Sequence, residues 1–341
     1  MFERMEGSLL VLGGSAFVGR ALVSEAVARD WEVTTFNRGT SSWTLPGVEA
    51  LHGDRLAPHG LAQLRGREWD LVVDTWSAAP RVVRDSARAL RDHAGRYAYI
   101  SSGSVYTPPP PRGALESAET VAADPAAEDG EYPELKRGAE IAVEQVFADR
   151  ALLARAGTIL GPYENVGRLT WWLARMARGG EILCPGPADL GIQYVDARDL
   201  AGFVIEASSA GHSGPFNVVS RQGYATMGSL LRACHCAAGA TDGVLTWIDP
   251  QTIAAAGIEP WSELPIWIPP GHEYSGMHDA NVDRAYRAGL QCRPVTDTVL
   301  DTWRWFSALN TAPPVRAGLP TPGLDTDRER QALAAWHEAN S

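Results

Sequence analysis

Tyr132 and Lys136 are the residues whose types and spacing best suit acid–base chemistry, because they stand four positions apart in the segment Tyr-Pro-Glu-Leu-Lys. On a helix, this spacing places both side chains on one face. A nearby ammonium group favours the ionised form of a tyrosine, whose ordinary pKa is about 10. Tyr132 is therefore predicted to exchange a proton with an oxygen atom of a substrate.

A tyrosine and a lysine at this spacing also occur by chance on solvated helix faces, so the pattern needs independent support. The composition supplies it, because Lys136 is the only lysine among 30 lysine and arginine residues. An ammonium is a compact point charge, whereas a guanidinium is a planar fork. The chain uses arginine everywhere else and keeps one lysine where a compact cation suits the chemistry.

Hydroxyl groups precede this pair in the segment Ser-Ser-Gly-Ser-Val-Tyr at 101–106, at the end of a predicted strand. Ser102 is predicted to donate a hydrogen bond to the reacting oxygen. Ser104 is the alternative donor and a candidate substrate contact, and Ser101 is predicted to face the sheet beside a cofactor. A Ser-His-Asp hydrolase is disfavoured, because the chain has no Gly-x-Ser-x-Gly segment.

A glycine turn at 13–19 follows an apolar run directly and opens a helical pattern, which is the context of a dinucleotide-binding turn. Gly13 permits the tight turn, the small Ala16 lets a pyrophosphate approach, and Gly19 lets the helix pack closely. The helix amino terminus then faces the phosphates. The alternative is a turn that only joins strand to helix. The predicted cofactor contacts in this turn are Gly13, Ser15, Ala16, Phe17, Val18 and Gly19.

The end of the second predicted strand reads Asn37-Arg38, where a site for NAD usually has an acidic residue. Arg38 offers a permanently charged fork to a 2'-phosphate, so NADP is the predicted cofactor. NAD stays the alternative, with Arg38 stacked on adenine or paired with a surface carboxylate. Asp54 is predicted to accept from the adenine amino group or to cap the next helix. Thr75 and Lys136 complete the predicted cofactor contacts, with Lys136 on the nicotinamide ribose.

Short apolar runs alternate with helical patterns up to about residue 155, which predicts an α/β fold with a Rossmann-type, doubly wound parallel sheet. The second part of the chain is predicted to be a smaller, discontinuous C-terminal substrate lobe. The predicted strands are 9–12, 32–36, 71–74, 97–101 and 151–155. The predicted helices are 18–29, 81–93, 167–178, 197–207, 227–237, 296–309 and 325–339.

Residues 1–160 are predicted to form the dinucleotide-binding domain, with about 193–220 returning to it, and residues 161–310 to form the substrate lobe. Residues 311–341 are predicted to be a Pro/Gly linker and a docking helix with Trp336 as its anchor. The acidic, proline-rich segment 107–131 is predicted to be a loop, either a lid or poorly ordered. Candidate substrate contacts in the second part are Asn165, Arg168, Gln193 and Arg198.

Composition restricts the function classes. A net charge of −11 disfavours a nucleic-acid surface. No apolar run approaches the roughly 20 residues of a membrane helix, and the first seven residues carry three charges, so we expect a cytoplasmic protein without a membrane partner. The four cysteines suggest reduced thiols. Cys234, His235 and Cys236 lack a second ligand cluster, so no metal is expected.

Taken in order, the glycine turn, the Ser-Ser-Gly-Ser-Val-Tyr segment and Tyr-Pro-Glu-Leu-Lys resemble the extended short-chain dehydrogenase/reductases, also called the NAD-dependent epimerase/dehydratase family. The segments 12–20 and 36–39 resemble the atypical branch of that family, in which Ala16 is a usual replacement for the middle glycine. Further matches are 161–162, 193–196 with 198–199, and 216–218. The resemblance implies that 158–162 passes the nicotinamide and that residues after Pro162 line the substrate.

Dehydratases of this family carry an Asp-Glu pair where this chain has Gly103 and Ser104, so a 4,6-dehydratase is disfavoured. The predicted function is an NADP-dependent oxidoreductase that transfers hydride between the nicotinamide and a carbonyl or secondary alcohol of a small polar metabolite, a sugar or natural-product intermediate. The alternatives are a sugar or sugar-nucleotide epimerase with retained cofactor, and a non-catalytic NADP-binding regulatory protein. Related enzymes often form homodimers through the Tyr-Lys helix, although its small apolar residues also suit internal packing.

Overall fold

The computed structural model describes residues 7–41, 43–313, 315–316, 318 and 320–341. Residues 1–6, which carry the three charges used in predicting a cytoplasmic protein, lie outside these residues. The chain divides into two compact units. Unit 1 comprises Met1–Gly157, Ala197–Val219 and Asn281–Gln291, and unit 2 comprises Thr158–Asp196, Ser220–Ala280 and Cys292–Ser341.

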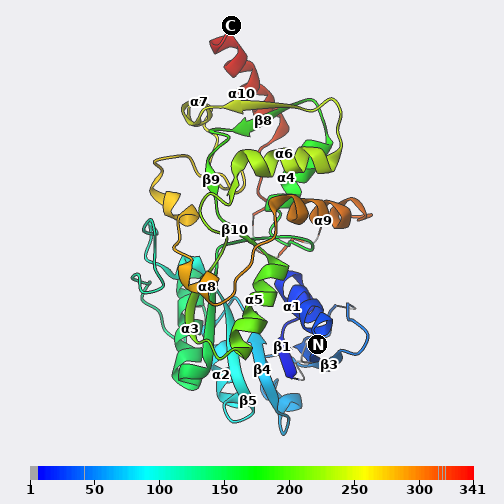
Figure 1. Cartoon of the computed structure of the whole chain (residues 1–341), viewed down its shortest axis with the longest axis vertical. Coiled ribbons are helices and arrows are strands. Elements are labelled where there is room, and N and C mark those ends of the chain that lie inside the picture. The colour runs from blue at the N-terminus through cyan, green and yellow to red at the C-terminus, as the bar shows by residue number, and fades with distance from the viewer. Residues whose placement is uncertain (1–6, 42, 314, 317, 319) are drawn as a thin grey trace. The chain divides into compact units, whose positions relative to one another are not determined.

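Unit 1 is built on one sheet of seven parallel strands in the order β11-β6-β5-β4-β1-β2-β3 (Figure 1). This Rossmann-type sheet confirms the predicted fold class. The five predicted strands are all present, and two more strands, β3 and β11, form the edges. The strands are β1 (Ser8–Leu12), β2 (Glu32–Asn37), β3 (Glu49–His52), β4 (Trp69–Asp74), β5 (Ala94–Ser102), β6 (Ala151–Ala156) and β11 (Gly214–Val218).

Helices pack on this sheet in pairs, α1 with α5 and α2 with α3. Leu10 and Leu12 of β1 share one core cluster with side chains of α2 and α3. Their neighbours Leu9 and Val11, which point to the opposite face, are equally buried. A strand buried on both faces gives the continuous apolar run seen in the sequence. The helices of unit 1 are α1 (Phe17–Ala28), α2 (Pro80–Leu90), α3 (Tyr132–Phe147), α5 (Ala197–Ser209) and α8 (Asp283–Arg287).

Unit 2 combines short strand pairs with helices around its own core, in which Trp172 and Trp267 are almost fully buried. The strand pairs are β7 (Thr158–Leu160) with β10 (Tyr194–Asp196), β8 (Glu181–Pro185) with β13 (Val244–Ile248), and β9 (Gly191–Ile192) with β12 (Ala225–Thr226). The helices are α4 (Arg168–Ala177), α6 (Met227–Ala238), α7 (Pro250–Ala255), α9 (Val295–Ser307) and α10 (Thr326–Ala339). Within the described part of the chain, no helix has the length and apolar character needed to span a membrane.

The C-terminal helix α10 docks on unit 2 through more than the expected tryptophan. Trp336 packs against the unit 2 core and stays half-buried. Leu333 is buried more deeply, and the buried Glu329 carboxylate forms an ion pair with Arg175 at 2.7 Å. The helix is therefore held by an apolar contact and by a buried charge pair on the same face.

One segment differs from the expected division of the chain. Residues 281–291 fall in the predicted substrate lobe, but they belong to unit 1. The reason is their contact with the edge of the sheet. Asn217 of β11 donates to the backbone oxygen of Asn281 at 2.9 Å, and the Arg284 guanidinium lies 4.4 Å from the centre of the Phe216 ring.

The segment 107–131 is a loop without helix or strand, as predicted, and it is fastened to unit 1 at several points. Near its start, Thr107 donates to the backbone oxygen of Glu119 at 3.0 Å. Near its end, Arg81 of α2 donates its backbone N–H to Ala127 at 3.2 Å. The loop backbone also presses on α3, since a Cβ at Gly138 would lie 2.6 Å from the backbone oxygen of Asp124.

Candidate active site

Lys136 is buried in unit 1, with only 3% of its surface exposed. Its Nζ donates to the backbone oxygens of Trp76 at 3.0 Å and Ile100 at 2.7 Å, and it lies 4.7 Å from the centre of the Tyr99 ring. These groups replace the water that a buried ammonium loses. They place the charge at the carboxyl ends of β4 and β5, the edge where parallel sheets bind ligands.

Tyr132 is the first residue of α3, and 42% of its surface is exposed. A capping box formed by Glu131 and Glu134 fixes this end of the helix. Tyr132 and Lys136 are four positions apart on the helix, which is a rise of about 6 Å along its axis. The phenol is therefore presented at the surface of unit 1, one helical turn from the buried ammonium.

Ser102 ends β5 and is half-buried. Its Oγ accepts hydrogen bonds from the Ser104 backbone N–H at 3.2 Å and from the Ser104 hydroxyl at 2.9 Å. Ser104 therefore orients Ser102, whereas the sequence offered the two as alternatives. With both acceptor bonds used, the hydroxyl hydrogen of Ser102 is available to a ligand oxygen. Ser102, Tyr132 and Lys136 all belong to unit 1.

The glycine turn has the tight geometry that its residues predict. Gly13 has φ +124°, and a Cβ there would lie 2.3 Å from the Thr75 hydroxyl. A Cβ at Gly19 would lie 2.6 Å from the backbone nitrogen of Gly14, so only glycine lets α1 begin this close to the turn. Thr75 packs against Gly13 and donates its hydroxyl hydrogen to the backbone oxygen of Leu12 at 3.0 Å.

The start of α1 suits a bound anion. Its N-cap is Ala16, and no side chain caps the helix. Its first turn contains no acidic residue. The backbone N–H groups near Phe17 and Val18 and the positive end of the helix dipole therefore suit the pyrophosphate of a dinucleotide. Ser15 lies half-buried beside them. The residues present fit a nicotinamide dinucleotide cofactor.

The second strand ends with Asn37 and Arg38. Asn37 accepts the Gly39 backbone N–H at 2.8 Å and so shapes the turn that follows β2. Arg38 is exposed, and its side chain forms no hydrogen bond or ion pair with the described residues. Pairing of Arg38 with a surface carboxylate, one of the predicted alternatives, is not seen among these residues.

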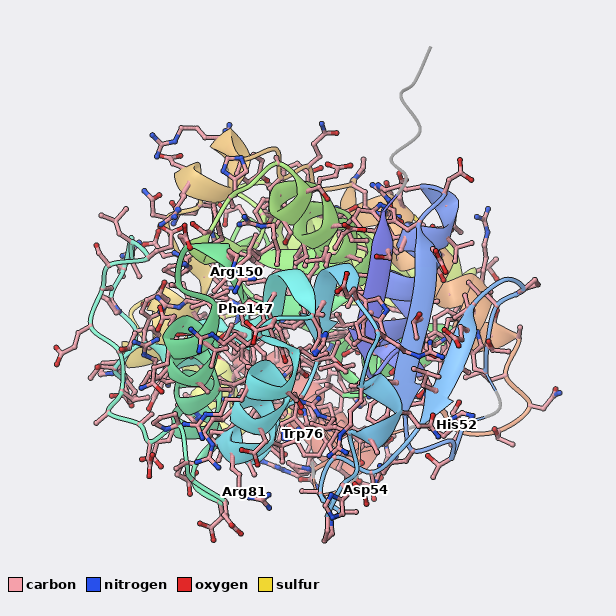
Figure 2. All side chains as sticks on the ribbon, turned by 90° about the horizontal axis from the view of Figure 1, so that it is seen from below. His52, Asp54, Trp76, Arg81, Phe147 and Arg150 are labelled. Atoms are coloured by element: carbon pink, nitrogen blue, oxygen red, sulfur yellow. The ribbon has the colours of Figure 1, made fainter. Side chains whose placement is uncertain are left out.

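Asp54 lies on an outer loop of unit 1 (Figure 2) and accepts the Leu56 backbone N–H at 2.9 Å. This bond stabilises its own turn. The neighbouring Arg55 points inward and forms a bidentate ion pair with Asp74, at 2.8 and 2.6 Å. We call this the β4 pair, because Asp74 is the last residue of β4. Tyr97 donates to the same carboxylate at 2.7 Å.

The β4 pair determines the local electrostatics. Burial by itself raises the pKa of the Asp74 carboxyl, but the charge and hydrogen bonds of Arg55, with the bond from Tyr97, hold that pKa below its usual value. Burial and the Asp74 charge raise the pKa of Tyr97 well above the usual value, and the pKa of Tyr99 is raised in the same way. Tyr97 and Tyr99 are therefore neutral at the pH where Tyr132 would act.

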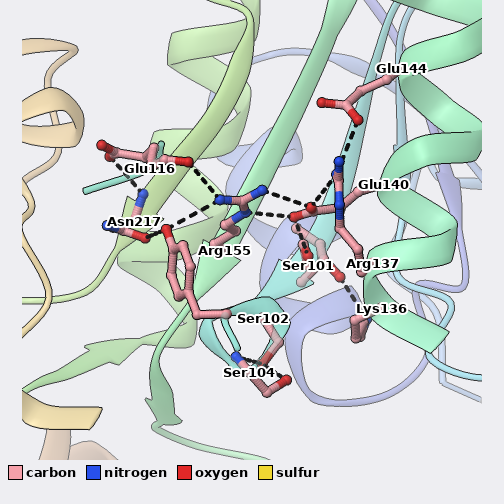
Figure 3. A network of polar contacts seen from close by, with 12 residues as sticks. Ser101, Ser102, Ser104, Glu116, Lys136, Arg137, Glu140, Glu144, Arg155 and Asn217 are labelled. Atoms are coloured by element: carbon pink, nitrogen blue, oxygen red, sulfur yellow. Dashed lines mark hydrogen bonds and ion pairs between the residues drawn. The ribbon is translucent and has the colours of Figure 1, made fainter. Parts of the chain in front are cut away.

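A second buried ion pair lies next to the predicted catalytic residues Ser102 and Lys136 (Figure 3). The Glu140 carboxylate accepts from Arg155 Nε and Nη2, both at 2.9 Å, and from the Ser101 hydroxyl at 2.7 Å. We call Arg155 and Glu140 the β6 pair, because Arg155 lies on β6. Burial lowers the pKa of Arg155, but the hydrogen bonds and charge of Glu140 outweigh it and raise that pKa above its usual value. Ser101 therefore faces α3.

Sequence reasoning missed both pairs, although a signal existed for the β6 pair. Glu140 stands four residues after Lys136 on the same helix, and Arg155 interrupts an apolar strand. A charged residue within a buried strand needs a partner. The sequence does not show which residue that partner is, because the partner of Arg155 lies 15 positions away in the chain and that of Arg55 lies 19 positions away.

The predicted substrate contacts do not form one group within either unit. Arg198 belongs to unit 1, whereas Asn165, Arg168 and Gln193 belong to unit 2. The Arg168 guanidinium lies 4.9 Å from the centre of the Trp261 ring. The backbone oxygen of Asn165 accepts from Arg316 at 2.8 Å.

Gln193 has a structural placement in unit 2. It is fully buried, and its amide nitrogen donates to the backbone oxygens of Ser220 at 2.9 Å and Ala280 at 3.0 Å. Its amide oxygen accepts the Ala280 backbone N–H at 2.7 Å. Because the amide is fully used in joining three segments, this geometry does not present Gln193 to a ligand.

Comparison with known proteins places the chain in a family. A sequence profile of the NAD dependent epimerase/dehydratase family matches residues 9–218, more than half of the chain. The chain belongs to this family. The family and its structural relatives are nicotinamide-dependent enzymes of the extended short-chain dehydrogenase/reductase type, which confirms the resemblance drawn from the sequence.

Solved structures with the same fold come from several members of the epimerase/dehydratase group. A putative epimerase from Burkholderia cenocepacia has a TM-score of 0.65 at 21% identity, covering 90% of this chain and 100% of that one. The dTDP-glucose 4,6-dehydratase of Bacillus anthracis, in complex with NAD, has a TM-score of 0.62 at 13% identity, covering 89% and 97%. UDP-glucuronic acid 4-epimerase from Bacillus cereus, also with NAD, has a TM-score of 0.62 at 14% identity, covering 89% and 100%.

A curated relative is the uncharacterized protein y4nG of Sinorhizobium fredii. It is 25% identical over 247 residues, which cover 67% of this chain. The match spans 60% of the relative's own length. This relative supports common ancestry and does not add an activity.

Proposed function

We propose that the chain is an NADP-dependent oxidoreductase that interconverts a carbonyl and a secondary alcohol on a small polar metabolite, a sugar or a natural-product intermediate. The observation that carries the proposal is the set of Ser102, Tyr132 and Lys136 at the carboxyl edge of the sheet, without the acid pair that a dehydratase needs. Gly103 and Ser104 occupy those positions, and Ser104 is engaged with Ser102.

The proposed mechanism assigns one task to each residue. A bound nicotinamide supplies or accepts the hydride. The Ser102 hydroxyl donates to the substrate oxygen and orients it. Tyr132 gives that oxygen a proton in reduction and takes it back in oxidation. Lys136 holds the nicotinamide ribose and favours the phenolate of Tyr132 through its charge.

The choice of NADP rests on Arg38. The side chain is exposed at the end of β2, carries a fixed charge and forms no ion pair with the described residues. A guanidinium binds a phosphate through two parallel hydrogen bonds. The competing choice of NAD is favoured by the solved relatives that carry NAD. An epimerase that retains its cofactor is the second candidate function, favoured by the epimerases among the same relatives.

Two measurements test the proposal. NADPH oxidation is followed at 340 nm with a panel of keto sugars, UDP-sugars and small ketones. We expect net NADPH consumption with at least one of them and a loss of roughly 10²- to 10⁴-fold in Tyr132→Phe. Sugar interconversion without net cofactor change would instead identify an epimerase. Full activity in Tyr132→Phe would overturn the catalytic assignment.

Binding titrations test the cofactor separately. Arg38→Ala should raise the Kd for NADPH by about 10- to 100-fold, because a charge-assisted hydrogen bond is lost, and should leave the Kd for NADH nearly unchanged. The matched control is Arg88→Ala, which removes an exposed arginine from α2. Equal losses for NADPH and NADH would contradict the choice of NADP.

A further inference from the structure

Glu140 lies on the helix that carries the proposed catalytic pair, eight residues after Tyr132 and four after Lys136. Its carboxylate is fully buried and accepts four hydrogen bonds from three side chains. A lone buried charge is costly, so such a carboxylate holds its donors in fixed places. Figure 3 shows Arg155 and Arg137 reaching it from different sides.

Two bonds from α3 reach consecutive residues at the end of β5. Lys136 donates to the Ile100 backbone oxygen at 2.7 Å, and Ser101 donates to Glu140 at 2.7 Å. Ser102 is the next residue of the strand. The two bonds lie one helical turn apart on α3, so together they restrict both sliding and rotation of the helix against the strand. They therefore fix α3, which carries Tyr132, relative to the end of β5, where Ser102 lies.

Arg155 holds Glu140 from the other side. Its Nε and Nη2 atoms donate to the two carboxylate oxygens of Glu140. Its Nη1 atom donates to the Glu116 backbone oxygen at 2.9 Å and to the Tyr106 hydroxyl at 3.3 Å. Tyr106 in turn donates to Asn217 of β11 at 2.6 Å. These hydrogen bonds thus connect α3, β6 and β11 with Tyr106 and with the 107–131 loop, all within unit 1.

We propose that Ser101, Glu140 and Arg155 are positioning residues, which hold Tyr132 and Lys136 in register with Ser102 during proton transfer. The proposal rests on the function proposed above, because it requires those three residues to act on a substrate. Reacting groups lose about 10²-fold in rate when they are misplaced by about 1 Å. A small shift of α3 would therefore lower turnover more than it weakens cofactor binding, because the glycine turn that suits the pyrophosphate does not lie on α3.

The test compares three variants with the wild-type enzyme, using the panel compound that it turns over fastest. Ser101→Ala removes one neutral donor and keeps the β6 pair. Glu140→Gln removes the charge. The matched control is Glu144→Gln, one turn further along α3, where the half-exposed carboxylate accepts from Arg137 at 3.1 Å.

We expect kcat to fall about 10-fold in Ser101→Ala and about 100-fold in Glu140→Gln, with a much smaller rise in the Kd for NADPH, because the glycine turn still holds the pyrophosphate in the folded protein. Glu144→Gln should match the wild type in both. If Glu140→Gln does not fold, Ser101→Ala carries the test alone. Wild-type kcat in Ser101→Ala, together with an inactive Tyr132→Phe, would overturn the positioning roles and leave the proposed function intact. An active Tyr132→Phe would overturn both.

Discussion

The β4 pair and the β6 pair are both buried ion pairs between an arginine and a carboxylate, but they differ in the segments they join and in the number of cations at the carboxylate. Arg55 and Asp74 join a loop to the end of one strand, and Arg55 is the one cation that contacts Asp74 within the described residues. Glu140 contacts two cations, Arg155 and Arg137. A charge with one partner depends on it fully, whereas a charge with two partners keeps one after the other is lost. The β4 pair should therefore matter more to folding, and the β6 pair more to turnover.

The largest expected effect is that of Arg55→Met. It leaves the fully buried Asp74 carboxylate without a cation, and breaking a buried pair in this way costs about 3–5 kcal/mol. Urea unfolding at pH 7 measures the free energy of unfolding. Arg84→Met is the control, because Arg84 pairs with Asp85 at the surface of α2. A loss no larger than that of the control would mean that the β4 pair does not stabilise the sheet.

Arg155→Met should destabilise the protein less, by about 1–3 kcal/mol, because Glu140 keeps the charge of Arg137 and the hydrogen bond from Ser101. Its kcat should nevertheless fall more than that of folded Arg55→Met. Unfolding and turnover measured on the same two variants decide the comparison. If the β6 variant proved the less stable of the two, the count of cationic partners would not explain the difference between the pairs.

The smallest expected effect is the change in the free energy of unfolding when the pH is lowered. The pKa of Asp74 is lowered in the folded protein, so its contribution to stability is present above the pKa of an unfolded aspartate, about 3.9, and is lost as pH falls through the lower folded pKa. In Arg55→Met, burial acts on the Asp74 carboxyl without its cation and raises its pKa, so the difference in unfolding free energy between the wild type and Arg55→Met should narrow progressively as the pH falls from 6 to 3. Urea midpoints measured from pH 6 to pH 3 test this. A difference independent of pH would contradict the assigned charge state of Asp74.

Local sequence predicted the parts of the site whose function depends on neighbours in the chain. Gly13 and Gly19 could be predicted because close backbone contacts and a positive φ at Gly13 exclude other residues. Tyr132 and Lys136 could be paired because a helix fixes the distance between positions four apart. The predicted strands were present for a similar reason, since burial on both faces leaves a continuous apolar run.

Contacts between segments far apart in the chain could not be predicted from the sequence. Gln193 resembles an exposed ligand contact in sequence, but its amide is used by Ser220 and Ala280. Ser104 and Ser102 seemed alternatives, and a short turn makes them partners. In each case a polar side chain has several partners available to it, and only the packing of remote backbone decides which one it meets.

The sequence by itself determined the family of chemistry: a dinucleotide turn, a tyrosine and a single lysine one helical turn apart, and a serine at a strand end. These are local features, set by steric exclusion and helical periodicity. Only the tertiary structure decided how helix α3 is fixed, because the Glu140 carboxylate must meet Ser101 of β5 and Arg155 of β6. Burial makes those meetings obligatory, since a charge removed from water must find its counter-charge within hydrogen-bond reach.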